Sequence, residues 1–246
     1  MIKKQLMKNH LSRRTSLIIG IVGVSAAVVM TSGYTFSKGG PPSETRVIDS
    51  FDRYDVGDFP KRFRTYPFQR GKAKSVYRVE EEGGNKYLQA VDKNDTSVLV
   101  MREFVWKIKT YPWISWQWRP KQLPPGGDER QRASNDSGCG VYLVFGKYSG
   151  RALKYVWSDK APVGTVVQKD PNKFHIIVQA SGPPRDPNAW YTVSVNVPEA
   201  YQEQFGEALP KAPTGIGLLT DGNALHVPAA CDYDGITVSR NEPLAR

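Results

Sequence analysis

Short runs of alternating apolar and polar residues repeat from Thr45 onward, with turn-forming residues between them. A period of two is the pattern of a strand that buries one face. The predicted strands are 45–51, 62–68, 75–80, 86–92, 97–106, 113–119, 140–147, 153–157, 174–180, 190–197, 215–220 and 235–240. Only residues 199–207 have a helical pattern, starting after Pro198 and ending near Gly206. Because helices do not alternate with strands, we predict an all-β, two-sheet β-sandwich of the jelly-roll kind with one short helix at 199–207.

The alternation also predicts which side chains face the core. In the segment 113–119, Trp116 and Trp118 share the face that also carries Ile114, so we expect both rings in the core. Trp113 and Arg119 share the opposite face, which is half polar and therefore the place to expect a ligand groove.

Two further runs place single residues on outward faces. Lys154 is out of phase with Tyr155 and Trp157, and Trp190 is out of phase with the apolar positions that follow it. We therefore expect Lys154 and Trp190 to point away from the core.

The first forty residues have the composition of an export segment. A basic stretch through Arg14 precedes an apolar run at 17–30, and no charge occurs from 17 to 36. This pattern fits a cleaved signal peptide or an N-terminal apolar helix that anchors the chain, by a Sec or a twin-arginine route. We expect a signal or anchor at 1–36, a linker at 37–44, a β-sandwich domain at 45–240 and a tail at 241–246. Either alternative places the domain in the periplasm or on the outer face of the inner membrane.

The net charge of +10 overstates how basic the domain is. Six basic residues and no acidic ones lie within residues 1–40, and the remainder carries 28 basic against 24 acidic side chains. Nucleic acid is therefore not the expected partner, and the predicted membrane contact is through the N-terminal segment alone.

Two cysteines, Cys139 and Cys231, fit an oxidising compartment. They either form a disulfide or remain as two buried thiols.

Carboxylates supply the candidate catalytic and metal chemistry. Asp128 or Glu129 with Asp136 could form the pair that cleaves a glycosidic bond, although these residues also fit a solvated loop. Zinc is not expected, because paired cysteines and closely spaced histidines are missing. Calcium is an alternative if the first and last strands pair, and turn-forming carboxylates explain the same pattern. The calcium candidates are Asp49, Asp52 and Asp234.

Residues 53–78 combine eight basic side chains and two acidic ones with interleaved aromatic residues. A charged outer strand face that prevents edge pairing would explain the stretch. The alternative is a site for an anionic glycan or a lipid headgroup.

Several segments together resemble an uncharacterised bacterial family, the domain-of-unknown-function family 3047, from Val47 to Arg240. These segments are Trp116–Arg119, Leu123–Pro124, Asp128–Arg130, Asn135–Asp136, Val141–Phe145, Lys154–Trp157, Pro162–Thr165, Gly217–Asp221 and Tyr233–Val238. The resemblance implies an exported jelly-roll-like domain and carries no established activity. Cys139 and Cys231 depart from the residues usual in the family, which would make a disulfide a local addition.

Taken together, these patterns favour non-catalytic binding of a carbohydrate or glycoconjugate at the cell envelope. Aromatic faces stack on sugar rings, and carboxylate, amide and guanidinium groups bind hydroxyls. The residues expected to form or flank one groove are Trp113, Arg119, Asp128, Asn135, Asp136, Lys154 and Asp221. A glycan hydrolase or lyase that uses Asp128 or Glu129 with Asp136 is the first alternative. An envelope protein-interaction module is the second.

Overall fold

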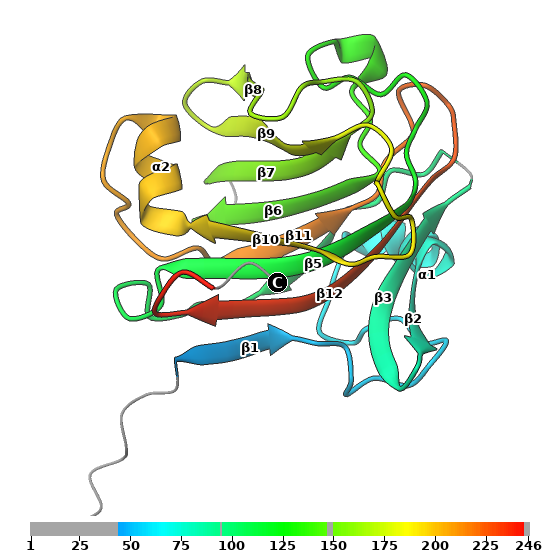
Figure 1. Cartoon of the computed structure of the whole chain (residues 1–246), viewed down its shortest axis with the longest axis horizontal. Coiled ribbons are helices and arrows are strands. Elements are labelled where there is room, and N and C mark those ends of the chain that lie inside the picture. The colour runs from blue at the N-terminus through cyan, green and yellow to red at the C-terminus, as the bar shows by residue number, and fades with distance from the viewer. Residues whose placement is uncertain (1–43, 94, 147–149, 244–246) are drawn as a thin grey trace, which may run out of the picture. The chain divides into compact units, whose positions relative to one another are not determined.

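Two six-stranded sheets face each other across an apolar interior in the computed structural model, which describes residues 44–93, 95–146 and 150–243 (Figure 1). The predicted two-sheet β-sandwich is thus confirmed. The expected signal or anchor at 1–36 lies outside the described residues. Within those residues, no helix is long and apolar enough to cross a bilayer.

Sheet A has the strand order β10-β5-β12-β3-β2, and β1 pairs with β12. Its strands are β1 (Thr45–Asp49), β2 (Tyr77–Glu82), β3 (Asn85–Asp92), β5 (Trp113–Gln122), β10 (Tyr191–Asn196) and β12 (Ala229–Ser239). All of these pairs are antiparallel. The first and last strands therefore pair, which is the condition that the calcium alternative requires.

Sheet B has the order β4-β11-β6-β7-β9-β8. Its strands are β4 (Val100–Glu103), β6 (Cys139–Phe145), β7 (Arg151–Ser158), β8 (Val166–Asp170), β9 (Phe174–Ser181) and β11 (Gly215–Leu219). β7 and β9 run parallel, and the other pairs are antiparallel.

The predicted helix is α2 (Val197–Phe205). The Asn196 side chain accepts a hydrogen bond from the backbone amide of Glu199, and Pro198 follows at the start of the helix. Gly206 ends the helix with a φ of 72°, a left-handed conformation that glycine adopts without steric cost.

One predicted strand is wrong. Residues 62–68 make a single isolated bridge, from Arg64 to Met101, and then enter the short 3₁₀-helix η1 (Pro67–Gln69) and the helix α1 (Arg70–Val76). Pro67 fits the start of a helical turn and cannot donate to a strand ladder. A second 3₁₀-helix, η2 (Arg132–Ser134), lies in the loop between β5 and β6.

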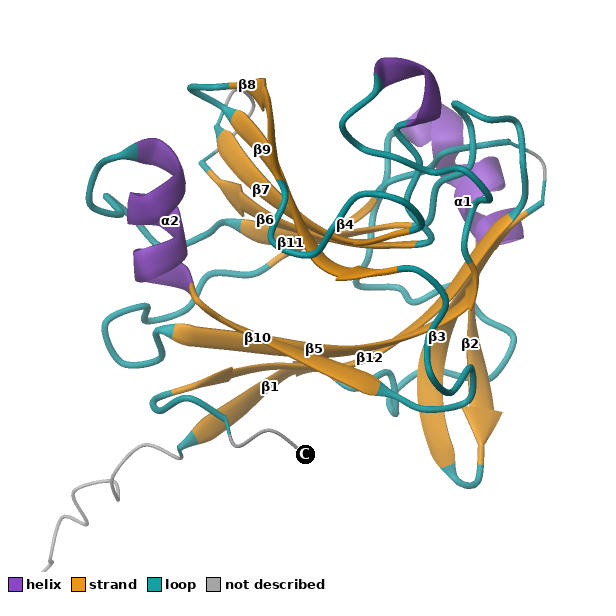
Figure 2. Cartoon of the chain, turned by 45° about the horizontal axis from the view of Figure 1, so that its top comes forward, coloured by secondary structure: helices purple, strands orange, loops and turns teal. Residues whose placement is uncertain are grey.

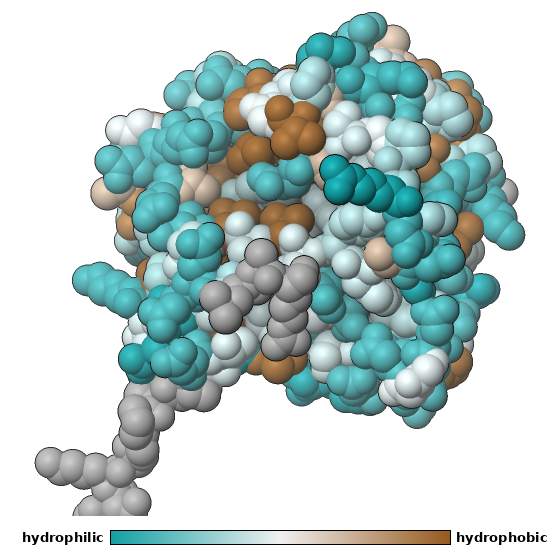
Figure 3. Space-filling model, viewed as in Figure 1, coloured by the Kyte–Doolittle hydropathy of each residue, from teal (hydrophilic) through white to brown (hydrophobic). Residues whose placement is uncertain are grey.

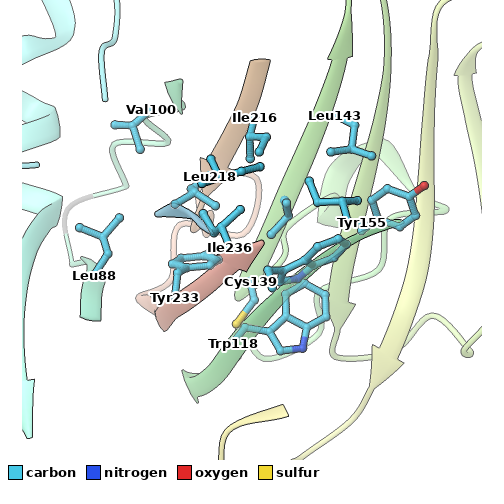
Figure 4. Close-up of a cluster of buried hydrophobic side chains, with 14 of the residues drawn as sticks. Leu88, Val100, Trp118, Cys139, Leu143, Tyr155, Ile216, Leu218, Tyr233 and Ile236 are labelled. Carbon is cyan, nitrogen blue, oxygen red and sulfur yellow. The ribbon is translucent and has the colours of Figure 1, made fainter. Parts of the chain in front are cut away.

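Aromatic rings from both sheets fill the interior. Trp116 and Trp118 are 1% and 0% exposed, which confirms their assignment to the core. The Trp116 ring centroid lies 5.5 Å from that of Tyr155, and the centroids of Trp118 and Trp157 are 6.0 Å apart. Figure 4 shows Trp118 and Tyr155 within this cluster of buried side chains. Aromatic contacts of this kind add to the free energy gained by burying apolar area.

Cys139 and Cys231 form a disulfide that links β6 of sheet B to β12 of sheet A. Both residues are fully buried in the core. The bond therefore joins the two layers covalently at positions 92 residues apart in the chain.

Candidate functional site

Arg119 is the centre of a polar cluster on the outer face of sheet A. Its neighbours in β5, Trp118 and Pro120, have the opposite phase, and Trp118 lies in the core. Arg119 Nε donates to Asp232 Oδ2 at 2.9 Å, and Nη1 donates to Glu82 Oε2 at 2.5 Å. The cross-strand register places Arg119 directly opposite Asp232, so β5 and β12 present the ion pair side by side.

Two aromatic rings pack against the Arg119 guanidinium. The guanidinium carbon lies 4.7 Å from the ring centroid of Trp190 and 5.1 Å from that of Tyr87. The two rings meet edge to face, with their centroids 5.5 Å apart. Trp190 directly precedes β10, and Tyr87 lies in β3. In Figure 2 the segment before β10 runs across to the β2–β3 hairpin, which brings the two rings together. Each ring is within range of a cation–π interaction.

Asp232 has one carboxylate oxygen without a partner. Oδ2 accepts from Arg119, whereas Oδ1 is buried and has no hydrogen-bond partner among the described residues. Burial raises the pKa of Asp232 to about 6, against the opposing effect of Arg119. An acceptor buried in this way is suited to a buried water as its donor.

Glu82 gives the cluster its solvent-facing side. Its side chain is 64% exposed although its carboxylate bonds to the buried Arg119. The hydrogen bond from Arg119 lowers the pKa of Glu82, so this carboxylate is ionised at neutral pH. Near it, Lys121 Nζ donates to the backbone oxygen of Pro187 and to Asn188 Oδ1, both at 3.3 Å, which ties the Trp190 segment to β5.

The surface view supports a polar character for the sheet A side. In Figure 3, the lower part of the face, at the level of β1 and β12 in Figure 1, is mainly hydrophilic. Hydrophobic side chains gather higher up, at the level of β7 to β9.

Trp113 shares the outer face with Arg119 but lies at the other end of β5. Six residues separate the two positions, a span of about 20 Å in an extended strand. Trp113 pairs with Asn196 and Ser239 and is half-buried. The ring beside Arg119 is therefore Trp190, and the expected partnership of Trp113 with Arg119 is not formed.

Lys154 belongs to a second polar cluster, on the outer side of sheet B. It is 1% exposed, and its Nζ lies 3.4 Å from Ser137 Oγ. The Cε atom of Lys154 lies over Gly140 of the neighbouring strand β6. A Cβ atom added to Gly140 would lie 3.1 Å from this Cε atom. The absence of a side chain at Gly140 therefore provides the space that Lys154 occupies.

Charges around Lys154 keep it protonated. Burial lowers the pKa of Lys154, but Tyr142, Asp221 and Glu129 outweigh that effect and raise it overall. Burial raises the pKa of Asp221, against the opposing effect of Lys154. The cluster is a buried cation surrounded by acidic groups.

The carboxylates of this second cluster are occupied by structural donors. Glu129 accepts from Ser137 Oγ at 2.8 Å and from Ser158 Oγ at 2.5 Å. Asp136 accepts from the backbone amides of residues 224 and 225 at 2.9 and 2.8 Å, which joins two loops.

Asp128 and Asn135 lie in the same β5–β6 loop. Asp128 forms a two-pronged pair with Arg130, at 2.8 and 2.6 Å, which lowers the pKa of Asp128. Asn135 is half-buried, and its Oδ1 has no partner among the described residues.

The calcium candidates lie at the paired first and last strands but have other partners. Asp49 accepts from Arg102 and from the Tyr54 hydroxyl, and Asp52 accepts from a serine hydroxyl. Asp234 accepts from Asn85 Nδ2 at 2.9 Å. In the described ranges, no group of three or more His, Cys, Asp or Glu side chains is placed to hold a metal ion.

The residues predicted to line one groove thus fall on two sheets. Arg119 and Trp113 lie on sheet A, and Lys154, Asp136 and Asp221 lie with the loops that cover sheet B. Sequence reasoning missed Tyr87, Trp190, Glu82 and Asp232 as neighbours of Arg119. The sequence did contain one signal for this site, because Trp190 is out of phase with the apolar positions that follow it and was therefore expected to point away from the core.

The profile of a family described as "Protein of unknown function (DUF3047)" matches residues 61–237. No curated protein matches the chain. Similar solved structures include a family 29 carbohydrate-binding module from Piromyces equi, with 11% identity, coverage of 80% of this chain and 90% of that chain, and a TM-score of 0.34. Another is TmCBM27, described for specific mannan recognition, at 10% identity, 81% and 99% coverage and a TM-score of 0.34. The xyloglucanase domain of NopAA, a type three effector from Sinorhizobium fredii, has 7% identity, 68% and 95% coverage and a TM-score of 0.37. At these values the likeness identifies neither a ligand nor a site in this chain.

Proposed function

The chain belongs to the DUF3047 family, and we propose that it binds a carbohydrate or glycoconjugate, without turning it over, at the Arg119 cluster on the outer face of sheet A. The observation that carries the proposal is the packing of Trp190 and Tyr87 around a buried Arg119–Asp232 pair, in which Arg119 also holds the exposed Glu82 carboxylate.

The chemistry of the cluster suits a sugar. Trp190 packs on Arg119 and is half-buried, so the exposed part of its indole is the surface that we propose stacks on a pyranose ring. The exposed Glu82 carboxylate is an acceptor for hydroxyl donors, and the buried Asp232 fixes the Arg119 guanidinium behind it. Because Arg119 is held by two carboxylates and two rings, the cluster is pre-organised and loses little entropy on binding.

The partners of the candidate acids argue against glycosidic catalysis. A general acid needs a raised pKa and a proton that can reach the bond. Asp128 has a lowered pKa and is paired with Arg130, whereas Glu129 and Asp136 are held by hydroxyl and amide donors. These contacts fit a role in fixing loops. We therefore rank the hydrolase or lyase below binding.

The proposed site of action is the cell envelope. This part of the proposal depends on the export pattern at residues 1–36, which lie outside the described residues. Fractionation of cells expressing the full chain tests it, and recovery in the cytoplasm would contradict it.

An oligosaccharide array tests the binding proposal. We expect the full-length protein to bind a defined set of glycans and a Trp190→Ala variant to lose that signal. Incubation with the bound glycans should release no new reducing or unsaturated ends. Release of such ends, lost in Asp136→Asn, would instead support the enzyme. An array without any signal would contradict carbohydrate binding.

A further inference from the structure

A cleft of about 750 Å³ that shares no lining residue with the proposed sugar site lies between the chain after β1 and helix α1. Basic side chains dominate its lining, with one acid among them, and aromatic rings complete it. The charged lining residues are Lys61, Arg64, Arg70, Lys74 and Asp58, and the rings are those of Phe59 and Phe63. A cleft with this lining is suited to an anionic group.

The cations around the cleft are solvent-exposed and unpaired. Seven basic side chains in residues 53–74 are exposed, and none has an ion-pair partner within the described part of the chain. They are Arg53, Lys61, Arg62, Arg64, Arg70, Lys72 and Lys74. Such a concentration of one charge costs self-repulsion, which an anionic partner would relieve.

An apolar projection stands beside these cations. Tyr66 and Phe68 are 67% and 80% exposed, and their rings stack on each other with centroids 5.7 Å apart and an interplanar angle of 15°. The 3₁₀-helix η1 holds them, because Gln69 N donates to Tyr66 O at 2.9 Å and the Thr65 hydroxyl donates to Gln69 Oε1 at 3.2 Å. Two large rings are thus kept in water on a defined turn of backbone.

The edge-protection explanation fits Arg78, which is exposed on the edge strand β2, but does not hold for the basic residues at 53–74. It needs a strand whose outer face carries the charge, and residues 62–68 contain only one isolated bridge. The basic residues and the exposed rings therefore require another explanation.

We propose that residues 57–74, the basic–aromatic surface, dock on a bilayer that contains anionic phospholipid. The cleft takes the phosphate of a headgroup, and Tyr66 and Phe68 enter the interface between headgroups and acyl chains. Basic side chains gain from the negative surface potential of such a membrane, and aromatic rings are favoured at its interface. The basic–aromatic surface shares no residue with the proposed sugar site.

The arrangement of the two rings favours a membrane over an anionic polysaccharide. Tyr66 and Phe68 do not line the cleft, so a sugar bound there would not lie on them. Phe68 has no polar group for a sugar hydroxyl, and one face of each ring is already used by the other. An apolar projection ringed by cations matches the composition of interfacial membrane-binding elements.

A fluorescent label at position 68 tests the proposal in the full-length chain. The two native cysteines are joined in the disulfide, so Phe68→Cys introduces a single free thiol for an environment-sensitive dye. We expect the emission to rise and shift to the blue with vesicles in which roughly one quarter of the lipid is phosphatidylglycerol, and not with pure phosphatidylcholine vesicles. An N-terminal anchor would hold the chain on both kinds of vesicle, so the difference reports on the basic–aromatic surface.

Two controls make the result specific. Val163→Cys carries the same dye at another exposed apolar position, 64% exposed between β7 and β8, and its emission should not change. Adding Lys61→Gln, Arg70→Gln and Lys74→Gln to the Phe68→Cys protein should raise the lipid concentration needed for a half-maximal response about 100-fold. Each of the three charges is expected to contribute about fivefold to the membrane affinity. These are surface changes, and an unchanged circular dichroism spectrum confirms folding.

Three results with vesicles would overturn the proposal. They are no response at position 68, an equal response on both kinds of vesicle, and an equal response at position 163. A response at position 68 to soluble polygalacturonate but not to vesicles would also overturn it and assign the surface to an anionic polysaccharide.

Discussion

Breaking the Cys139–Cys231 disulfide should lower the free energy of unfolding by about 4–5 kcal/mol. The bond closes a loop of 92 residues, and the entropy that it removes from the unfolded chain grows with the logarithm of that length. Both sulfurs are fully buried between the sheets, so the loss of their packing adds to this value in an alanine variant. For a domain of this size, the change is a large part of its expected stability.

Urea unfolding followed by tryptophan fluorescence measures the effect. The Cys139→Ala/Cys231→Ala variant should be compared with the oxidised protein and with protein unfolded and refolded under reducing conditions. The reduced protein keeps its sulfur atoms, so the difference between oxidised and reduced forms isolates the bond. In the alanine variant and in the reduced protein, we also expect the unfolding free energy to depend more steeply on urea concentration. Without the bond, the unfolded chain exposes more surface.

The reasoning would be refuted by a loss below about 2 kcal/mol with an unchanged urea dependence. That result would mean that the unfolded chain is already compact without the bond. Equal stability of the oxidised and reduced forms, with a lower stability of the alanine variant, would assign the effect to packing instead.

Three further predictions concern buried charge and packing. Burial raises the pKa values of Asp232 and Asp234 to about 6, so the native state binds more protons than the unfolded chain between about pH 4 and pH 6. Stability should therefore fall as pH rises through that window, by about 3 kcal/mol for each group, and urea unfolding of Asp234→Asn should show a smaller fall than the native protein. Lys154→Met leaves buried acids without their cation and should cost about 3–5 kcal/mol, against less than about 1 kcal/mol for the exposed control Lys173→Met. Equal losses in a thermal melt would contradict a special role for Lys154. Gly140→Ala places a Cβ 3.0 Å from a backbone oxygen and 3.1 Å from the Lys154 side chain and should cost about 1–3 kcal/mol in urea unfolding, and a neutral result would mean that the Lys154 chain moves aside freely.

The alternation of residues predicted most of the sandwich because burial on one face of a strand leaves a period of two in the sequence. It assigned Trp116 and Trp118 to the core and Arg119 to the outer face. It failed at 62–68, where basic and aromatic residues alternate but Phe63 is the one residue that the described structure buries. It also missed β8, whose residues are exposed or half-buried and therefore leave no apolar stripe.

The candidate site needed information that local patterns do not hold. Arg119 meets Asp232 and Glu82 because β5, β12 and the β2–β3 hairpin lie in one sheet, and strand order depends on contacts across more than a hundred residues. Trp113 was the nearer ring in sequence, but Trp190 is the nearer ring in space. Local patterns also do not show which sheet a strand joins. For this reason Lys154, which lies on sheet B, was predicted to share a groove with Trp113 and Arg119 of sheet A.

Isothermal titration of Trp190→Ala with the glycan that the native protein binds best on the array tests the central claim most directly. Trp113→Ala is the matched control, because it removes a half-buried indole from the same sheet face about 20 Å away. We predict that Trp190→Ala weakens binding by about tenfold or more, as expected for loss of one stacking ring, and that Trp113→Ala leaves the affinity within about twofold. Equal losses in the two variants, or a loss in Trp113→Ala alone, would contradict a sugar site at the Arg119 cluster.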